Sequence, residues 1–171
     1  MAPKETQAFT GACGCGKVTY QMSSAPMFVH CCHCQECQTQ TGSAYVLNAI
    51  IEADRVTFSG ETSDHRLATP SGKGQIITRC ASCGTAVFSS YLVRLGKLKY
   101  VRVGTLDNPD LCAPDAQIFT ASKQKWVPLN QNIPAFENFY EFKEIWPEEA
   151  YRRLVDVFGE ARTDPNGSSA R

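Results

Sequence analysis

The chain has 171 residues, of which 43% are hydrophobic, a length and composition suited to one domain with a buried core. Lysine and arginine together number 17, as do aspartate and glutamate, so the formal net charge is zero. Zero net charge argues against a nucleic-acid or anionic-membrane binder, and we expect a small-molecule partner instead.

Nine cysteines are the unusual feature of the composition. The N-terminal sequence MAPKETQAF has no apolar segment typical of a secretory signal, and no later stretch approaches the roughly 20 apolar residues that span a bilayer. We therefore expect a cytoplasmic protein whose thiols stay reduced. In that setting, clustered cysteines indicate metal binding or catalysis rather than disulfides.

Short β-branched and aromatic segments alternate with glycine, serine, aspartate and proline from residue 8 to about residue 121, a pattern typical of β-strands. The predicted strands, in chain order, are Lys17–Met22, Met27–His30, Ser43–Ile51, Arg55–Phe58, His65–Thr69, Gln75–Arg79, Thr85–Tyr91, Lys99–Val103 and Ala116–Thr120. Between the second and third of them, Cys34–Gln40 is predicted to form one or two helical turns that end at Thr41-Gly42.

A longer helix is predicted over residues 147–159. Pro147 suits the first helical position, and Glu148 and Glu149 are favourable at the positive end of the helix dipole. Apolar residues then recur at helical spacing until Gly159, which supplies a stop.

Seven of the nine cysteines fall into three short groups, Cys13-Gly14-Cys15, Cys32-His33-Cys34-Gln35-Glu36-Cys37 and Cys80-Ala81-Ser82-Cys83. Two ligands on one short loop lose little entropy when they bind the same metal. The last pair is followed by Gly84, which can turn the backbone under a metal. We therefore predict a closed structural zinc site with four sulfur ligands, namely Cys13, Cys15, Cys80 and Cys83.

The middle group offers three thiolates, Cys32, Cys34 and Cys37, within six residues. Three protein ligands with an open fourth position are the arrangement expected of catalytic zinc. Sulfur ligands favour zinc, with iron as a weaker alternative. We therefore predict two Zn2+ ions per chain, the second at this open site.

Whether the second site is open depends on nearby side chains. In an extended segment, His33 points to the face opposite Cys32, which makes it a candidate supporting residue rather than a ligand. His30 shares the face of Cys32, and Cys112 cannot be placed from sequence, so either could close the fourth position. Cys31 and Cys112 fit no group, and core packing is the favoured interpretation for both.

The cysteine groups and their flanking residues resemble a known pattern: Gly11-x-Cys13-x-Cys15-Gly16-x-Val18-x-Tyr20, Cys32-His33-Cys34-x-x-Cys37 with Thr41-Gly42-Ser43, and Arg79-Cys80-x-x-Cys83-Gly84-Thr85. The pattern is similar to that of the glutathione-dependent formaldehyde-activating enzyme family, which includes the centromere protein V relatives. The resemblance covers roughly residues 8 to 140, and a later segment, Pro114 to Trp126, is weakly similar.

The resemblance implies a mainly β, tent-like fold of small antiparallel sheets stapled by zinc, followed here by the short C-terminal helix. It implies the same division of ligands, with four structural cysteines and a reactive zinc at Cys32, Cys34 and Cys37. It also implies glutathione and formaldehyde as partners in a carbon–sulfur lyase reaction that gives S-hydroxymethylglutathione. The domain division predicted from these patterns is an N-terminal extension (1–7), a zinc-binding β domain (8–146), the helix (147–159) and a disordered tail (160–171).

Three thiolates around Zn2+ leave a net charge of −1, which makes bound water a weaker source of hydroxide than at a site with neutral ligands. The site is better suited to holding a substrate thiolate for attack on a small aldehyde. His33 and His65 are the candidate acid or base groups. The rival interpretations are a zinc-ribbon-like binding module with two structural metals, or a related thiol-dependent enzyme with a different substrate.

Two further features concern packing and partners. The aromatic residues, Trp126 among them, are expected mainly in the core. Residues 131–146 could carry an exposed apolar contact surface, which leaves room for an oligomer.

Overall fold

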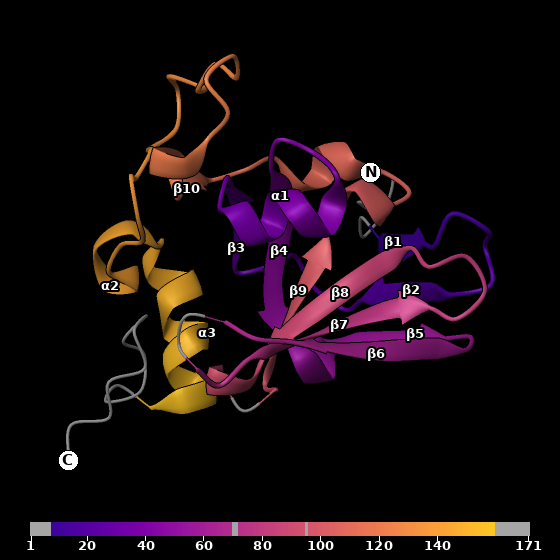
Figure 1. The fold of residues 1–171 in the computed structure, drawn as a ribbon. Helices are drawn as coiled ribbons and strands as arrows, with labels where there is room; N and C mark the ends of the chain where they lie inside the picture. Colours follow the sequence, from indigo (N-terminus) through magenta and orange to yellow (C-terminus); the bar gives the residue numbers. More distant parts are fainter. Residues whose placement is uncertain (1–7, 70–71, 95, 160–171) are drawn as a thin grey trace, which may run out of the picture.

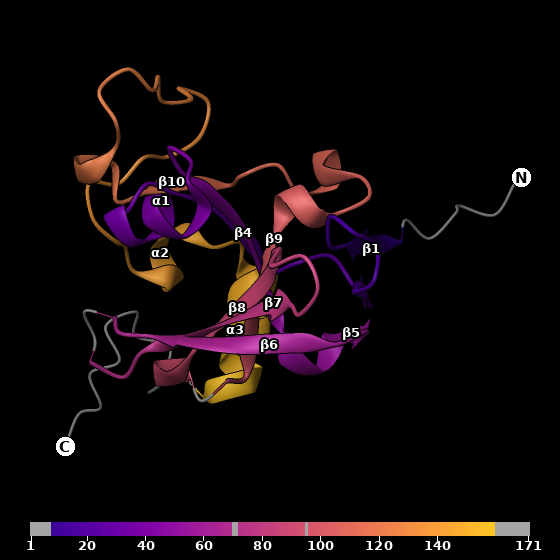
Figure 2. The ribbon, with the colours of Figure 1, turned by 45° about the vertical axis from the view of Figure 1, so that its right-hand side comes forward.

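Most of the chain folds as β-strands in two sheets (Figures 1 and 2). The computed structural model describes residues 8–69, 72–94 and 96–159. Within them, a three-stranded antiparallel sheet has the order β1 (Phe9–Ala12), β2 (Thr19–Met22), β5 (Val56–Ser59). A seven-stranded sheet has the order β10 (Ala116–Ile118), β3 (Phe28–Cys32), β4 (Val46–Glu52), β9 (Leu98–Arg102), β8 (Ala86–Tyr91), β7 (Gln75–Cys80), β6 (Thr62–Leu67).

The helices are short. They are α1 (Gln35–Thr41), α2 (Phe142–Ile145) and α3 (Glu148–Phe158), with single 3-10 turns at Ala53–Arg55, Leu92–Arg94, Val103–Thr105, Pro109–Cys112 and Thr120–Ser122. Gly42 ends α1 in the left-handed conformation that glycine adopts most readily. No helix among the residues described here has the length and apolarity needed to cross a membrane.

Strands β3 and β4 of the seven-stranded sheet are buried on both faces, and successive side chains of each strand point to opposite sides. Val29 and Ile51 pack with Tyr20 of the small sheet in one hydrophobic cluster. Their neighbours Phe28 and Ile50 belong to a second cluster that the C-terminal segment covers with Tyr140, Phe142, Trp146 and Leu154. Figure 1 accordingly places the small sheet and α2 on opposite sides of the molecule.

An ion pair holds α3 to the edge of this core. The Arg153 side chain donates to Glu52 at the end of β4, with 2.8 Å between Nε and Oε1. Glu52 is buried, and the Ala25 carbonyl accepts a second bond from the same guanidinium at 3.0 Å. Ala150 and Leu154 are buried on the helix face that turns toward the second cluster.

The predicted fold class is confirmed: the chain is mainly β with antiparallel sheets and a short C-terminal helix. Each predicted strand overlaps an observed one, and the two predicted helices are present. The pairing of β10 with β3 is parallel, so the large sheet is not antiparallel throughout. The domain division stays a prediction, and its extension (1–7) and tail (160–171) lie outside the described residues.

Apart from the 3-10 turns, two elements have no counterpart among the predicted ones. The helix α2 is a single turn, too short for a periodic signal. Strand β1 contains Gly11, which weakens a strand pattern. The structure gives the reason for that glycine: a Cβ at Gly11 would lie 2.4 Å from both the Thr105 carbonyl oxygen and the Tyr20 ring.

Candidate metal centres

Four cysteines meet where the small sheet approaches the end of β7. Cys13 and Cys15 lie in the turn after β1, Cys80 is the last residue of β7, and Cys83 lies in the turn between β7 and β8. Their Sγ atoms all lie within 4.8 Å of one another. Cys13 Sγ is 3.5 Å from Cys15 Sγ, which is 3.8 Å from Cys80 Sγ. Sulfurs that share a tetrahedral zinc at about 2.3 Å would be about 3.8 Å apart, so this group fits a zinc ion.

Both turns of this site have the same construction. The amide of Gly16 donates to the Cys13 carbonyl at 3.0 Å, and the amide of Gly84 donates to the Cys80 carbonyl at 2.9 Å. Both glycines have positive φ, 74° and 73°, which side chains other than glycine rarely adopt. Each turn therefore presents two sulfurs on one side of a tight backbone loop.

Hydrogen bonds already favour thiolate at part of the four-cysteine group. The Thr85 hydroxyl and amide lower the pKa of Cys83 to about 5. The Val18 amide, whose nitrogen is 3.2 Å from Cys13 Sγ, lowers the pKa of Cys13 against the effect of burial. The Lys17 amide favours the Cys15 thiolate as well, but sharing hydrogen bonds with neighbouring sulfurs raises the pKa of Cys15 to about 11. A cation is what would let all four sulfurs ionise together.

Three further cysteines meet where β3 leads into α1. Cys32 ends β3, Cys34 caps the N-terminus of α1, and Cys37 lies in its first turn. Their Sγ atoms also lie within 4.8 Å of one another, with 3.5 Å between Cys37 and Cys32. The Cys37 amide donates to Cys34 Sγ at 3.3 Å. Cys32 and Cys37 are buried whereas Cys34 is half-buried, so solvent reaches the group on the side of Cys34.

The pKa values of Cys32, Cys34 and Cys37, called the triple below, show that the group lacks a positive charge. Side-chain hydrogen bonds from Cys32 and Cys37 lower the pKa of Cys34 to about 3. Those contacts and burial raise the pKa of Cys32 well above its usual range. Cys37 gains some stabilisation from Cys32, but Cys34 and burial raise its pKa to about 12. Without a cation the triple therefore holds one thiolate between two thiols, and a soft divalent cation fits its three sulfurs.

Neither His30 nor Cys112, the two candidates for a fourth ligand, belongs to the three-cysteine group. His30 Nε2 is 2.5 Å from the Tyr140 hydroxyl, and burial lowers the pKa of His30 to about 3, which keeps the ring neutral. Cys112 belongs to the hydrophobic cluster on the other face of the large sheet. Among the described residues, the group contains three ligand atoms and no fourth histidine, cysteine or carboxylate.

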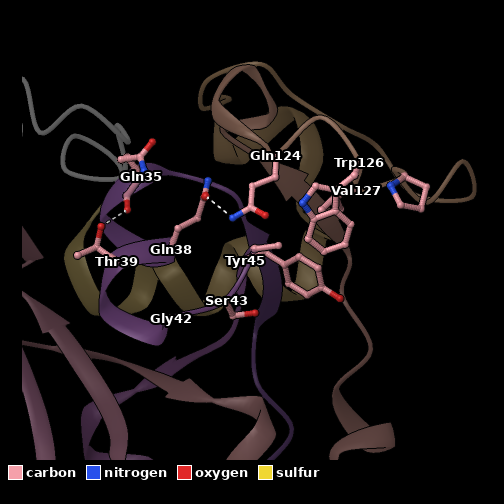
Figure 3. Close-up of a pocket in the computed structure, with 11 residues that line it drawn as sticks. Gln35, Gln38, Thr39, Gly42, Ser43, Tyr45, Gln124, Trp126 and Val127 are labelled. Carbon is pink, nitrogen blue, oxygen red and sulfur yellow. Dashed lines mark hydrogen bonds between the residues drawn. The ribbon is translucent and has the colours of Figure 1, made fainter.

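A cavity of about 790 Å³ lies beside α1 (Figure 3). Gln35, Gln38 and Thr39 of α1 line it, together with residues 42–45 and with Gln124, Trp126, Val127 and Pro128. The Gln124 side chain donates to Gln38 Oε1 at 3.2 Å, which ties that segment to the helix. None of the three cysteines lines the cavity, although α1 carries both Cys37 and lining residues.

Comparison with known proteins identifies the family. The family model described as "Glutathione-dependent formaldehyde-activating enzyme" matches residues 8–122. The chain belongs to this family. Membership supports an activity related to glutathione and formaldehyde.

Other comparisons add little to the family assignment. No curated protein matches the chain. A crystal structure of a Rhodobacter sphaeroides protein has a TM-score of 0.46 and 14% sequence identity, covering 74% of this chain and 98% of that chain. A likeness of that degree carries no argument about function.

The candidate supporting residue of this family member, His33, is buried and points away from the triple. Its Nε2 is 3.5 Å from Cys31 Sγ, and its ring lies 5.3 Å from that of Tyr45. The His33 backbone is the part that contacts α1, because its carbonyl accepts from Gln38 Nε2 at 2.7 Å and from the Ser122 hydroxyl at 3.2 Å. Cys31 is buried in the core, as predicted.

The structure corrects one expectation and adds residues that the sequence pattern did not single out. Trp126 is 74% exposed and lines the cavity, as does the 40% exposed Tyr45, so Trp126 is not a core residue. His65 is exposed on β6, outside both cysteine groups. Asn48 and Arg102 are buried near the triple, and no local motif marks them because β4 and β9 meet only through long-range pairing.

Proposed function

We propose that the protein is a zinc-dependent carbon–sulfur lyase acting on adducts of a thiol and a small aldehyde. Glutathione and formaldehyde, which join to give S-hydroxymethylglutathione, are the first pair to test. The observation that carries the proposal is the three-cysteine group, in which no fourth ligand from the described residues completes a tetrahedron. An open position beside three sulfurs suits an enzyme better than a purely structural metal site.

The reaction requires a thiolate and a place for one proton. The thiol sulfur bonds to the aldehyde carbon, the carbonyl π electrons move to oxygen, and the proton lost by the thiol ends on that oxygen. The reverse reaction breaks the carbon–sulfur bond and returns both molecules, without any oxidant or reductant. Zinc bound to Cys32, Cys34 and Cys37 would supply the positive charge that keeps a substrate thiol deprotonated at neutral pH.

The residues around the three cysteines would exclude water on one side of the group and leave the other side open to substrate. Cys32 and Cys37 are buried against the second hydrophobic cluster, which excludes water from one side of the group. Cys34 is half-buried and leaves the other side approachable. Shielding the reacting sulfur from water on all but one side strengthens its interaction with a nearby positive charge.

We further infer that the cavity beside α1 receives the body of the thiol substrate. Its lining combines amide side chains with the exposed rings of Tyr45 and Trp126, and none of the described residues that line it is charged. Lys123 immediately precedes the lining residue Gln124 and is the candidate to meet a substrate carboxylate. These roles follow from position on one helix and one loop, which the Gln38–Gln124 bond holds together.

The direct test measures chemistry and coordination on the same zinc-loaded protein. Two-dimensional NMR exchange spectroscopy on ¹³C-formaldehyde with glutathione should show faster interconversion of aldehyde and adduct when the enzyme is present. X-ray absorption averages over both zinc ions, so glutathione should raise the mean number of sulfur neighbours per zinc from about 3.5 to about 4. The C34S variant should lose both effects while the four-cysteine site keeps its zinc.

Two results would count against the proposal. One is an exchange rate that the zinc-loaded protein does not change. The other is a C34S variant that unfolds as readily as C80S, which would favour a binding module with two structural metals. Exchange with another thiol but not with glutathione would keep the reaction class and change the substrate.

A further inference from the structure

A row of buried polar residues crosses the large sheet beside the three-cysteine group. His30 of β3 pairs with Asn48 of β4, and Asn48 pairs in turn with Arg102 of β9. Directly paired residues point to the same face, so all three side chains lie on the face that carries Cys32. The His30 ring forms a hydrogen bond with the Tyr140 hydroxyl. Arg102 is the charged member of the row, and its partners need a separate account.

Arg102 is a buried cation without a carboxylate partner. It is 8% exposed, and its Nη1 donates to the Asn48 side-chain carbonyl. Its Nε is buried with no hydrogen-bond partner, and the ion pairs found among the described residues do not include Arg102. A buried guanidinium with a neutral amide as its partner is costly unless an anion lies nearby.

The groups within reach that a bound metal would make anionic belong to the three-cysteine group. Cys32 is two strands across and two residues along from Arg102, which places their Cα atoms roughly 12 Å apart at ordinary sheet spacings. Two side chains that point to the same face, one of them a long arginine, close most of that distance. Burial lowers the pKa of Arg102, and Cys37, Tyr91 and Cys32 oppose this effect when they are ionised.

Tyr91 cannot serve as the anion at neutral pH, because burial raises the pKa of its hydroxyl well above the usual value. Arg79, the other cation that acts on Arg102, adds positive charge rather than removing it. Cys32 and Cys37, which a bound zinc would hold as thiolates, are therefore the remaining neighbours of Arg102 that can supply negative charge, among the groups that act on its charge.

We propose that Arg102 is the counter-charge of the three-cysteine site, a positioning residue that stabilises the thiolates and the metal they hold. This inference rests on the proposed zinc at that site. Three thiolates with a divalent cation carry a net charge of −1, and Arg102 supplies the matching charge. Each partner removes the cost of burying the other, which explains a buried arginine that forms no ion pair with a carboxylate among the described residues. Asn48 fixes the guanidinium beside the cysteines.

Zinc affinity tests the proposal without any substrate. Competition with a chromophoric chelator should show that R102M weakens zinc binding at the three-cysteine site by about tenfold, whereas R102K, which keeps the charge, loses much less. The four-cysteine site in the same chain serves as an internal control and should keep its affinity. After cobalt substitution, the sulfur-to-metal charge-transfer bands of the three-cysteine site should shift in R102M.

Arg94 offers a matched control. It is also a buried arginine, but its guanidinium lies over the Phe142 and Phe158 rings, 5.3 and 5.6 Å from their centroids. The R94M variant should lose stability without a selective loss at either metal site. Equal zinc affinity in R102M and wild type would overturn the proposal, even if R102M lowered the rate with substrate, because Arg102 would then act on the substrate instead.

A second variant covers the case in which R102M does not fold. N48D leaves Arg102 in place and sets a carboxylate against it, which competes with the thiolates for the same positive charge. We expect N48D to fold and to bind zinc at the three-cysteine site several-fold more weakly, with N48L as the uncharged comparison. An N48D variant with undiminished affinity would contradict the counter-charge role. These outcomes are independent of catalysis, so they stay distinct from a failure of the proposed reaction.

Discussion

Position 84 favours glycine because of its backbone conformation and not because of close neighbours. Its φ is 73°, and a Cβ at this position would meet nothing within 4 Å. Any effect of G84A therefore comes from the left-handed conformation rather than from a clash. The same absence of close neighbours holds at Gly104, whose φ lies outside the positive region.

We expect G84A to lower the free energy of unfolding of the zinc-loaded protein by about 1 kcal/mol, the penalty for alanine in the left-handed region. The matched variant G104A should have unchanged or slightly greater stability. Urea unfolding followed by circular dichroism measures both. Equal losses in the two variants would show that the turn at Gly84 is not the source of the effect.

Trp126 gives the proposed substrate cavity its own optical signal. The chain has two tryptophans, and Trp146 is only 5% exposed whereas Trp126 is 74% exposed. A ligand in the cavity should shift Trp126 emission to shorter wavelength, because it replaces water around the indole. S-methylglutathione, which has no free thiol, should give a saturable shift in wild type and none in W126F. A shift that persists in W126F would assign the signal to Trp146 and remove support for the cavity.

At the scale of elements, the ion pair between buried Glu52 and half-buried Arg153 joins β4 to α3. Burial by itself raises the pKa of Glu52, but the Arg153 hydrogen bond and charge outweigh it, so the folded-state pKa lies below the usual value of about 4.3. A carboxyl with a lowered folded-state pKa adds stability above its unfolded pKa. That stability is lost as pH falls through the folded pKa.

We expect E52Q to unfold about 2 kcal/mol more easily than wild type at pH 7, because Arg153 is left without its charged partner. The difference should shrink below about pH 4.3 and vanish once Glu52 is protonated in the folded protein. Thermal or urea unfolding at several pH values measures the two curves. Parallel curves down to pH 3 would assign the loss to packing rather than to charge.

The sequence predicted those parts of the site whose chemistry is local. Cys80 and Cys83 lie three residues apart and Gly84 follows, so the ligand pair and its turn are visible in one short segment. Most strands were visible for the same reason, because alternation and turn residues are local signals. Strand β1 was missed, since Gly11 interrupts its pattern for a reason that lies far away at Thr105.

What the sequence could not predict depends on long-range register. His30 and Cys32 share a face of β3, but only the position of Tyr140 shows that the His30 ring is already bonded. Arg102 meets Asn48, a residue 54 positions earlier, through the pairing of β4 with β9. The exposure of Trp126 follows from the path of the segment that passes α1, and local composition does not specify that path.

At the scale of the whole molecule, the two candidate metal sites connect segments at very different separations along the chain. The four-cysteine site links the turn after β1 of the small sheet to the end of β7 in the large sheet, and Cys15 and Cys80 are 65 residues apart. The three-cysteine site links β3 only to the adjacent α1. Closing a long loop restricts the unfolded chain far more than closing a short one, so the four-cysteine site should carry most of the metal-dependent stability.

We therefore expect metal removal to proceed in two steps. A chelator should first empty the three-cysteine site, which has one ligand fewer, with little change in far-ultraviolet circular dichroism. Loss of the second zinc should coincide with cooperative unfolding. In zinc-loaded protein, C80S should lower the free energy of unfolding by about 4 kcal/mol or more, and C34S by far less. Unfolding at the first step would mean that the junction of β3 and α1, rather than the contact between the two sheets, is where metal holds the fold together.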